Sequence, residues 1–434
     1  MRSFYLLLLK EIKEIFFSKT TALFLIILSF MIGYSFYSAV SLYSNASVSA
    51  INNPLYATGF EPNIGVFVPS FGGLFLLFSL FLPFIIIPLI SLEKEQNTMS
   101  ILVQIPFSFN KILLSKFIAS FLFLIFVFLL ETPSLIIWKI YGGHIPWTEF
   151  LLLNLGYLFY GIFIISISIF SASIFKSTAS ASISSILIVI ISWIIDFGKD
   201  MNISPLILTI SNWTTTSRLN FFEQGIFSFS SIVYFIVLFL FFIFLSRCFL
   251  DIKFRKKYIL FSIITAFLGI ITIFYFNFNI DLTESNRNSF PKNITNALLK
   301  TPKITIDIYM RREDSRFKDY KDSFLDKLSL IKRNVEVNFM KGKELKDKYG
   351  LFVYKINNKF QKTYSNSEEE IFPIIFKLSN IKLQKIKESD KYQGYPLIVK
   401  KARLNIISYV YYLFVPLLFL IFYFTRIKFR ASKN

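Results

Sequence analysis

The chain has 434 residues, of which 54% are hydrophobic and 19% aromatic, with a mean hydropathy of +0.57 and a formal net charge of +20. Soluble domains are about 45–50% apolar, so this composition excludes a soluble globular protein and indicates a polytopic membrane protein. Basic residues in such proteins mainly set topology and meet anionic lipid headgroups. No nucleic-acid-reading motif accompanies the positive charge, so we do not expect nucleic acid as a partner.

The residue types needed for most metal and redox sites are nearly absent. Cys248 is the only cysteine and His144 the only histidine. A single cysteine cannot form an internal disulfide or a thiolate cluster. His144 lies in the turn Gly142-Gly-His-Ile-Pro146, so we do not expect a histidine-based metal site or a catalytic triad. We therefore expect no catalytic residue, no bound metal and no cofactor in this chain.

Residues 1–18 predict an interfacial amphipathic helix. Charges at positions 10, 11, 13 and 14 interrupt an apolar pattern of helical period, and they also exclude a cleavable signal peptide. A helix of this kind lies in the plane of the membrane surface. The alternative is an irregular extension of the first span.

Eight apolar stretches satisfy the length of about 20 residues that a helix needs to cross a bilayer. They lie at 20–43, 70–92, 112–138, 149–175, 179–197, 229–250, 257–279 and 404–426. The lysines and arginines that flank these spans all fall on one side if both termini are cytoplasmic, which is the orientation that the positive-inside rule favours. Pro83 and Pro88 predict kinks in the second span.

The segment at residues 93–109, between the second and third spans, is amphipathic and should lie on the cytoplasmic membrane surface. It is either an ordinary loop or the place where a soluble ATPase pushes on the membrane part. No phosphate-binding loop of the Gly-x-x-x-x-Gly-Lys-Ser/Thr type occurs in the chain, so any ATP hydrolysis needs a partner. The candidate docking residues are Glu93, Lys94, Glu95, Gln96, Asn97, Thr98, Met99, Leu102 and Pro106.

Glu131 is a carboxylate inside the third predicted span, and Pro133 follows it closely. Carboxylates within a membrane are costly and are functional candidates by default. Glu131 has two possible roles: handling a substrate or proton, or hydrogen bonding at the break that Pro133 introduces.

Residues 280–403, between the last two spans, predict a small external α/β domain. Alternating residues predict strands at 303–309, 335–339 and 350–356, with a hairpin at 357–358 that leads into another strand. Helical spacing covers 314–332. The sequence Ser367-Glu-Glu-Glu370 reads as a capping box that opens a helix reaching about residue 380.

The segment at 93–109 resembles the charged elbow of type-2 ABC exporter permeases, Glu-x-x-x-Gly-Thr-x-x-x-Leu-x-x-x-Pro-x-Ser…Gly-Lys. The matching residues are Glu93, Thr98, Leu102, Pro106, Ser108 and Lys116, whereas Asn97 and Ser115 stand where the family has glycine. More narrowly, residues 154–184 and 221–235 look like spans four to six of the gliding-motility permease. Residues 280–434 look like a shortened companion subunit of that permease.

The resemblance implies an α-helical polytopic membrane protein in five parts. These are the interfacial helix at 1–18, a six-span permease at 19–250, a seventh span at 251–279, an external domain at 280–403 and an eighth span with a basic cytoplasmic tail at 404–434. The implied partners are two ABC ATPase subunits that bind ATP and Mg, a second copy of this chain or a related permease, membrane lipids and an envelope protein. The implied location is the bacterial inner membrane, with residues 280–403 on the periplasmic or extracellular side.

Three functions are open at this point. The first is export of a hydrophobic or amphipathic substrate. The second is mechanotransmission, in which ATP hydrolysis drives the external domain without moving cargo. The third is an ATP-independent channel or secondary carrier, which Glu131 would serve as a proton relay.

Overall fold

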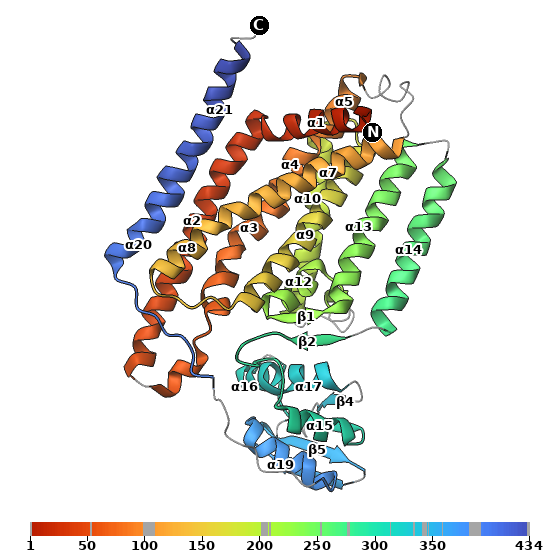
Figure 1. The fold of residues 1–434 in the computed structure, drawn as a ribbon. Coiled ribbons are helices and arrows are strands. Elements are labelled where there is room, and N and C mark those ends of the chain that lie inside the picture. The colour runs from red at the N-terminus through yellow and green to blue at the C-terminus, as the bar shows by residue number, and fades with distance from the viewer. Residues whose placement is uncertain are drawn as a thin grey trace. The chain divides into compact units, whose positions relative to one another are not determined.

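The computed structural model describes residues 2–52, 54–98, 109–200, 207, 210–251, 254–275, 278–312, 314–332, 335–340, 345, 347–357, 359–381 and 392–431. The chain divides into two compact units (Figure 1). The helical unit comprises Met1–Gly198, Thr209–Leu282 and Gln393–Asn434, and the α/β unit comprises Lys199–Leu208 and Thr283–Tyr392.

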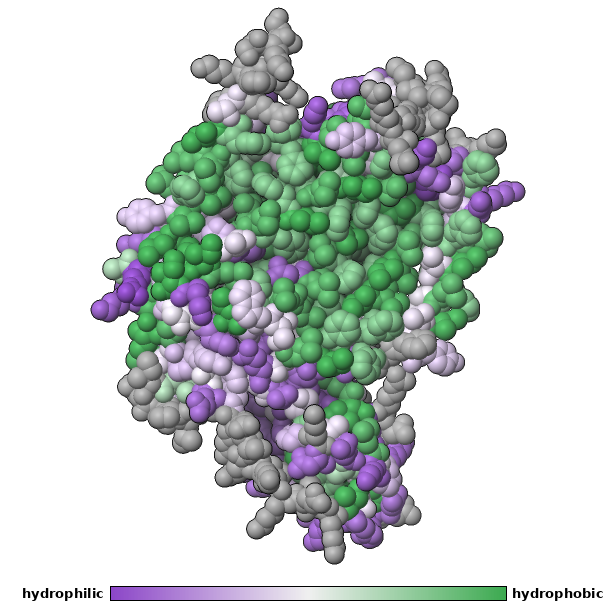
Figure 2. All heavy atoms as spheres, viewed as in Figure 1, coloured by the Kyte–Doolittle hydropathy of each residue, from purple (hydrophilic) through white to green (hydrophobic). Residues whose placement is uncertain are grey.

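Eight helical stretches among the described residues are long and apolar enough to cross a membrane, which confirms the predicted number of spans. Figure 2 shows apolar residues over most of the visible face of the helical unit, as expected for a surface that meets lipid. The eight stretches are Lys19–Ala50, Asn63–Leu80, Phe109–Ile140, Trp147–Ile174, Thr178–Phe197, Phe229–Leu250, Arg255–Ile273 and Lys401–Tyr423.

The second span is broken where its prolines predict. The helix stops at Phe81 and again at Ile87, and Pro83 and Pro88 each lie in the first turn of the helix that follows. Proline lacks the amide hydrogen that would continue the ladder, so each break falls just before it. The elements up to this point are α1 (Arg2–Phe16), α2 (Lys19–Asn52), η1 (Pro54–Gly59), η2 (Asn63–Phe67), α3 (Val68–Leu80), α4 (Leu82–Ile86) and α5 (Pro88–Glu95).

The long helices of this unit run side by side, and α1 lies across the end of the bundle at which α5 ends (Figure 1). A two-stranded ribbon of β1 and β2 lies at the opposite end, paired antiparallel from Ile226 with Asp281 to Ser228 with Asn279. The remaining elements of this unit are α7 (Phe109–Phe128), η3 (Leu129–Glu131), α8 (Thr132–Ile140), α9 (Trp147–Ile174), α10 (Thr178–Asp200), α12 (Thr215–Glu223), β1 (Ile226–Ser228), α13 (Phe229–Leu250), α14 (Arg255–Tyr275), β2 (Asn279–Asp281), α20 (Lys401–Ser408), η6 (Tyr409–Phe414) and α21 (Val415–Ala431).

The last span packs against the first. Ser29 on α2 donates a 2.5 Å hydrogen bond to the backbone oxygen of Tyr411, and Gly33 lies so close that a Cβ atom there would stand 2.5 Å from the Cβ of Tyr411. The absence of a side chain at Gly33 therefore allows the two helices to touch. Although more than 350 residues of sequence separate them, the first and last spans belong to one unit.

The α/β unit contains a four-stranded sheet of order β4-β3-β5-β6, in which β3 and β4 are parallel and the other neighbours antiparallel. Alternate residues of β3 and β5, among them Ile306 and Tyr354, face a core shared with the helices. The elements are α15 (Lys292–Lys300), β3 (Ile304–Ile308), α16 (Ser315–Tyr320), η5 (Lys321–Leu325), α17 (Asp326–Ile331), β4 (Val335–Phe339), β5 (Phe352–Ile356), β6 (Lys359–Thr363) and α19 (Glu368–Leu378).

The predicted α/β region between the last two spans is thus confirmed, with one difference in detail. The capping box at Ser367 is wrong as a side-chain cap: α19 does begin at Glu368, but the Ser367 side chain makes no capping hydrogen bond.

The first span is longer than predicted. The sequence predicts it at 20–43, whereas α2 continues to Asn52, through serines and asparagines that do not end a helix on their own.

Candidate functional site

The end of α5 carries three consecutive charged residues, Glu93, Lys94 and Glu95. Successive residues of an α-helix point about 100° apart, so three neighbours in sequence reach three different surroundings. Each of these side chains contacts a different part of the helical unit. The predicted docking segment therefore begins at a junction of helices.

Glu93 belongs to a buried ion cluster that joins α1, α5 and α7. The Lys116 ammonium lies 2.9 Å from Glu93 Oε2 and 3.0 Å from Glu11 Oε1, and it donates a 2.6 Å hydrogen bond to the backbone oxygen of Leu89. Lys116 is 1% exposed, Glu11 0% and Glu93 7%, so the cluster is shielded from water. Breaking one partner of such a pair leaves an uncompensated buried charge.

Lys10 closes the cluster on its exposed side. Its ammonium lies 2.7 Å from Glu93 Oε1 and 3.4 Å from Glu14. Burial lowers the pKa of Lys10, but the hydrogen bond to Glu93 and the charges of Glu11, Glu93 and Glu14 outweigh it and raise that pKa. Burial raises the pKa of Glu11, Lys116 opposes this effect, and Glu93 adds to it.

Three carboxylates of this cluster, those of Glu11, Glu14 and Glu93, can each place one oxygen within 4.8 Å of the others, which is close enough to share a cation. The ammonium groups of Lys10 and Lys116 already contact oxygens of all three residues. Two lysines thus offset most of the negative charge of the three carboxylates, and each carboxylate already contacts an ammonium group. We interpret the group as an ion-pair network and not as a metal site.

Lys94 and Glu95 hold the turn between α9 and α10. The Lys94 ammonium donates to the backbone oxygens of Ala172, Ser173 and Phe175 at 2.7, 2.6 and 3.3 Å, where α9 ends and its carbonyls lack helical partners. Burial, followed by the charge of Lys176, lowers the pKa of Lys94 to about 8. Glu95 Oε1 accepts a 2.7 Å hydrogen bond from the amide of Thr178, the first residue of α10.

The turn after α5 presents Gln96 and Asn97 on the surface. Asn97 has a φ of 57°, in the left-handed region that glycine and asparagine adopt most readily. Asparagine can therefore stand where the family pattern has glycine. Thr98 Oγ1 donates to the Glu93 backbone oxygen at 3.2 Å, and the other predicted docking residues, Met99, Leu102 and Pro106, lie outside the described residues.

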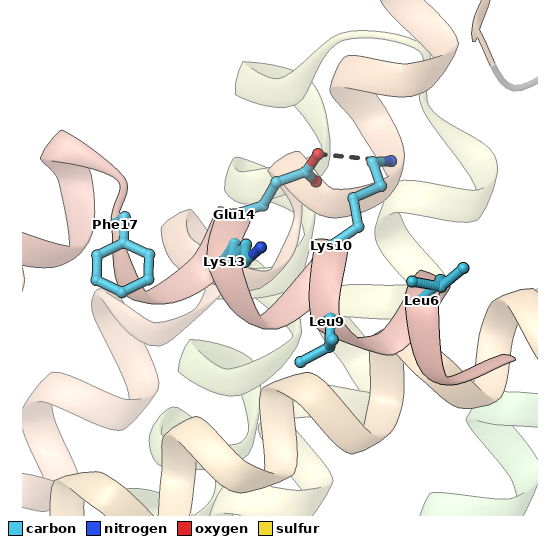
Figure 3. Close-up of a pocket in the computed structure, with 6 residues that line it drawn as sticks. All are labelled: Leu6, Leu9, Lys10, Lys13, Glu14 and Phe17. Carbon is cyan, nitrogen blue, oxygen red and sulfur yellow. Dashed lines mark ion pairs between the residues drawn. The ribbon is translucent and has the colours of Figure 1, made fainter. Parts of the chain in front are cut away.

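A shallow pocket runs along the outward face of α1 beside this cluster (Figure 3). Leu6 is 60% exposed, and the Lys10–Glu14 ion pair crosses the same face. The pocket thus combines apolar and charged groups, as protein interfaces do. Its lining residues are Leu6, Leu9, Lys10, Lys13, Glu14 and Phe17.

Glu131 lies within the membrane span, at the break between α7 and α8. It is 3% exposed, and its Oε2 accepts a weak 3.5 Å hydrogen bond from Ser134 Oγ, whereas Oε1 has no hydrogen-bond partner among the described residues. Pro133 lies in the first turn of α8, so the backbone is broken where Glu131 stands. Ser134 Oγ is also 2.6 Å from the hydroxyl of Tyr411 on the last span. This polar group connects the third and last spans.

Three contributors to these sites were not assigned a role from the sequence. Glu11 seemed part of the polar face of α1, yet it lies in the buried stripe with Leu7 and Ile15, at helical spacing from both. That spacing is a signal that could have identified it. Lys116 and Tyr411 lie far along the chain from Glu11 and Ser134, which they contact, and no local sequence pattern predicts these two contacts.

The comparison with known families matches less than half of the chain, within its N-terminal part. Residues 5–199 match the family model described as ABC-2 family transporter protein. No curated protein and no solved structure matches the chain. The matched range contains α1, α5, the start of α7 and the α9–α10 turn, so it includes the whole ion cluster and both clamps at the end of α5.

Proposed function

We propose that this chain, an ABC-2 family transporter membrane protein over residues 5–199, exports a hydrophobic or amphipathic substrate with energy from a separate ABC ATPase. The ATPase would bind ATP and Mg and would dock on α1 and on the turn after α5. As the membrane subunit of an ABC-2 type transporter, the chain would act with two ATPase copies and with a second copy of itself or a related permease. The lysines and arginines that flank the spans favour the cytoplasmic side for α1 and for the turn after α5.

The observation that carries this proposal is the junction at the end of α5. Glu93 is joined to α1 and α7 through Lys116 and Lys10, while Lys94 and Glu95 are joined to the ends of α9 and α10. A force applied to the exposed turn therefore reaches four other elements through short polar contacts, of which that between Lys116 and Glu93 is buried. Packed helices respond to such a force by moving as rigid bodies between discrete arrangements.

The docking surface would be the exposed groups next to this junction. Gln96, Asn97 and the outward face of α1 are accessible, whereas Glu93 is buried and would act by positioning the turn. The direct contacts would therefore come from the turn and from residues such as Leu6 and Lys13. The role of Lys94 would also be to position the turn.

Copurification of the ATPase from native membranes tests this proposal. A variant with Lys13→Glu and Gln96→Glu reverses one exposed charge and adds another on the docking surface. We expect it to recover at least about tenfold less ATPase, equivalent to about 1.4 kcal/mol, because both changes disturb the charge complementarity of the proposed interface. Lys139→Glu, at the far end of α8, is the matched control. Recovery of the ATPase at the wild-type yield by the double variant would show that the partner docks elsewhere.

Mechanotransmission is the second candidate, and one observation favours it. The extended segment that leads into the last span is fastened to α2: Ser47 Oγ accepts from the amide of Leu397 at 2.9 Å, Ser44 Oγ accepts from that of Val399 at 2.8 Å, and Tyr43 donates to the oxygen of Tyr395 at 2.7 Å. A movement of the first span would therefore pull directly on the chain that follows the α/β unit.

Site-directed crosslinking separates the two candidates. A disulfide introduced between α2 and the 393–400 segment should leave substrate export intact if the segment is only a tether. Under mechanotransmission it should abolish the output without reducing ATP hydrolysis. An ATP-independent carrier would instead keep working without the ATPase and would lose a proton-driven flux in Glu131→Gln.

A further inference from the structure

Arg218 on α12 is enclosed by two aromatic side chains. Its guanidinium carbon lies 5.2 Å from the centroid of the Trp213 ring and 5.7 Å from that of the Tyr234 ring. The Tyr234 hydroxyl donates a 2.5 Å hydrogen bond to the backbone oxygen of Trp213, which fixes the two rings relative to each other. The rings hold the cation in place but supply only a weak counter-charge.

The guanidinium is short of acceptors. Its Nη1 donates one long hydrogen bond of 3.4 Å to Ser230 Oγ, and its Nε is buried with no hydrogen-bond partner. No carboxylate among the described residues forms an ion pair with it. Burial lowers the pKa of Arg218, and Tyr234 opposes this effect. Arginine nevertheless remains charged in proteins, so a positive charge stands here without an anion among the described residues.

A second arginine, near the other end of α13, shows what a self-contained site looks like. Arg247 also lies between two rings, those of Phe109 at 5.1 Å and Tyr258 at 4.5 Å. Its Nη2, however, lies 3.2 Å from Asp251 and donates a 2.6 Å hydrogen bond to the Tyr258 hydroxyl. Each arginine thus lies between two aromatic rings, but among the described residues only Arg247 has a carboxylate partner.

The surroundings of Arg218 suit an anion. Ser230 lies in the first turn of α13, a helix of 22 residues whose N-terminus attracts negative charge, and Ser228 caps that end by accepting from the Ser231 amide. The Ser231 hydroxyl, on a residue that is 0% exposed, has no hydrogen-bond partner among the described residues. Two donors are therefore unused beside a helix N-terminus.

The position in the fold favours a lipid as the source of the anion. α13 is a membrane span, so its first turn lies at the level where a bilayer places its phosphates. Tryptophan and tyrosine are the residues typical of that level. Phe229 and Ile236, 38% and 43% exposed, offer an apolar surface on the same helix for an acyl chain.

We propose that Arg218, with Trp213, Tyr234 and Ser230, binds the phosphate of a membrane phospholipid, and that this phosphate supplies the counter-charge that no carboxylate among the described residues provides. The lipid phosphate takes the unused Nε and Nη donors of the guanidinium, and its acyl chains lie along α13. This site does not rest on the proposed transporter function, since it follows from the charge balance of α12 and α13 alone.

Native mass spectrometry of the full chain in detergent tests this proposal, with phosphatidylglycerol added and then depleted by washing. We expect the wild-type chain to retain one phospholipid and Arg218→Gln to retain it roughly tenfold less well, since a charge-assisted hydrogen bond is lost. Arg218→Lys should fall between them. Arg255→Gln is the matched control, because Arg255 also lies over an aromatic ring, that of Phe249 at 5.9 Å, but is exposed at the start of α14.

Three outcomes would overturn the proposal. The first is equal retention by Arg218→Gln and the wild-type chain, and the second is an equal loss in Arg255→Gln, which would mean that any interfacial arginine has the same effect. The third is displacement of the lipid by inorganic phosphate at millimolar concentration, which would identify a free anion as the ligand. If Arg218→Gln fails to fold, Arg218→Lys and Trp213→Leu carry the comparison, and both should retain less lipid than Arg255→Gln.

Discussion

The two ends of the helical unit handle buried charge in different ways. At the end where α1 crosses the bundle, Lys10 and Lys116 pair with the carboxylates of Glu11, Glu14 and Glu93, and each of these five groups has a partner of opposite charge. At the opposite end, Arg218 is held by rings and one long hydrogen bond, without a carboxylate.

This difference teaches what each end can do. A cluster whose charges pair across helices fixes those helices to one another. Separating the helices would leave buried charges without their partners, which is costly. Arg218 contacts α13 only through one long hydrogen bond and the Tyr234 ring, and no carboxylate among the described residues pairs with it, so we expect it to take an anion from outside the chain. The first arrangement suits the transmission of force, and the second suits the binding of a ligand.

The largest expected effect on stability comes from removing Lys116, the central cation of the ion cluster that joins α1, α5 and α7. Lys116→Met leaves Glu11 and Glu93 buried without their shared partner, and we expect a loss of about 3–5 kcal/mol in the free energy of unfolding. Denaturant unfolding in detergent measures it. Lys111→Met, one turn earlier on α7 and exposed, should change stability by less than about 0.5 kcal/mol. Equal stabilities of the two variants would break the comparison at its stronger side.

A smaller effect should separate the two arginines. In detergent without added phospholipid, Arg247→Gln leaves Asp251 without its cation, and because that carboxylate is partly exposed we expect a loss of about 2 kcal/mol. Arg218→Gln removes a charge that has no internal partner, so stability should stay within about 0.5 kcal/mol of the wild type. Paired thermal melts measure both. A large loss in Arg218→Gln would reveal an internal partner and contradict the contrast.

Much of the fold could be predicted from the sequence because membrane spans and alternating strands are local patterns. The eight spans and the strands at 304–308 and 335–339 follow from apolar runs and β-branched alternation, and Pro83 and Pro88 marked both breaks in the second span. The α2 helix extends further than expected, since serine and asparagine do not end a helix on their own.

The candidate site could be predicted only in part, because its partners come from distant helices. The position of Glu93 in a functional segment could be proposed from a motif that also contains Lys116, but its burial also depends on Lys10 and Glu11, which lie outside that motif. The pattern of three charges at residues 93–95 is typical of a solvated surface, although all three side chains contact neighbouring helices. Long-range pairing of this kind is what a single sequence leaves undetermined.

The smallest expected effect on stability concerns Lys94, whose ammonium contacts backbone carbonyls at the end of α9. Its pKa is lowered to about 8 in the folded chain, mainly by burial, whereas an unfolded lysine titrates near 10.4. Between these pH values Lys94 binds a proton more often in the unfolded chain than in the folded one. The contribution of Lys94 to the free energy of unfolding must therefore rise with pH from about 8 to about 10. We expect a rise of less than about 1 kcal/mol, because Lys94 is only half-buried and solvent screens it. Melting temperatures measured across this pH range should climb more steeply for the wild type than for Lys94→Met. Parallel curves would mean that the backbone oxygens at the end of α9 stabilise the Lys94 ammonium as well as carboxylates stabilise that of Lys10.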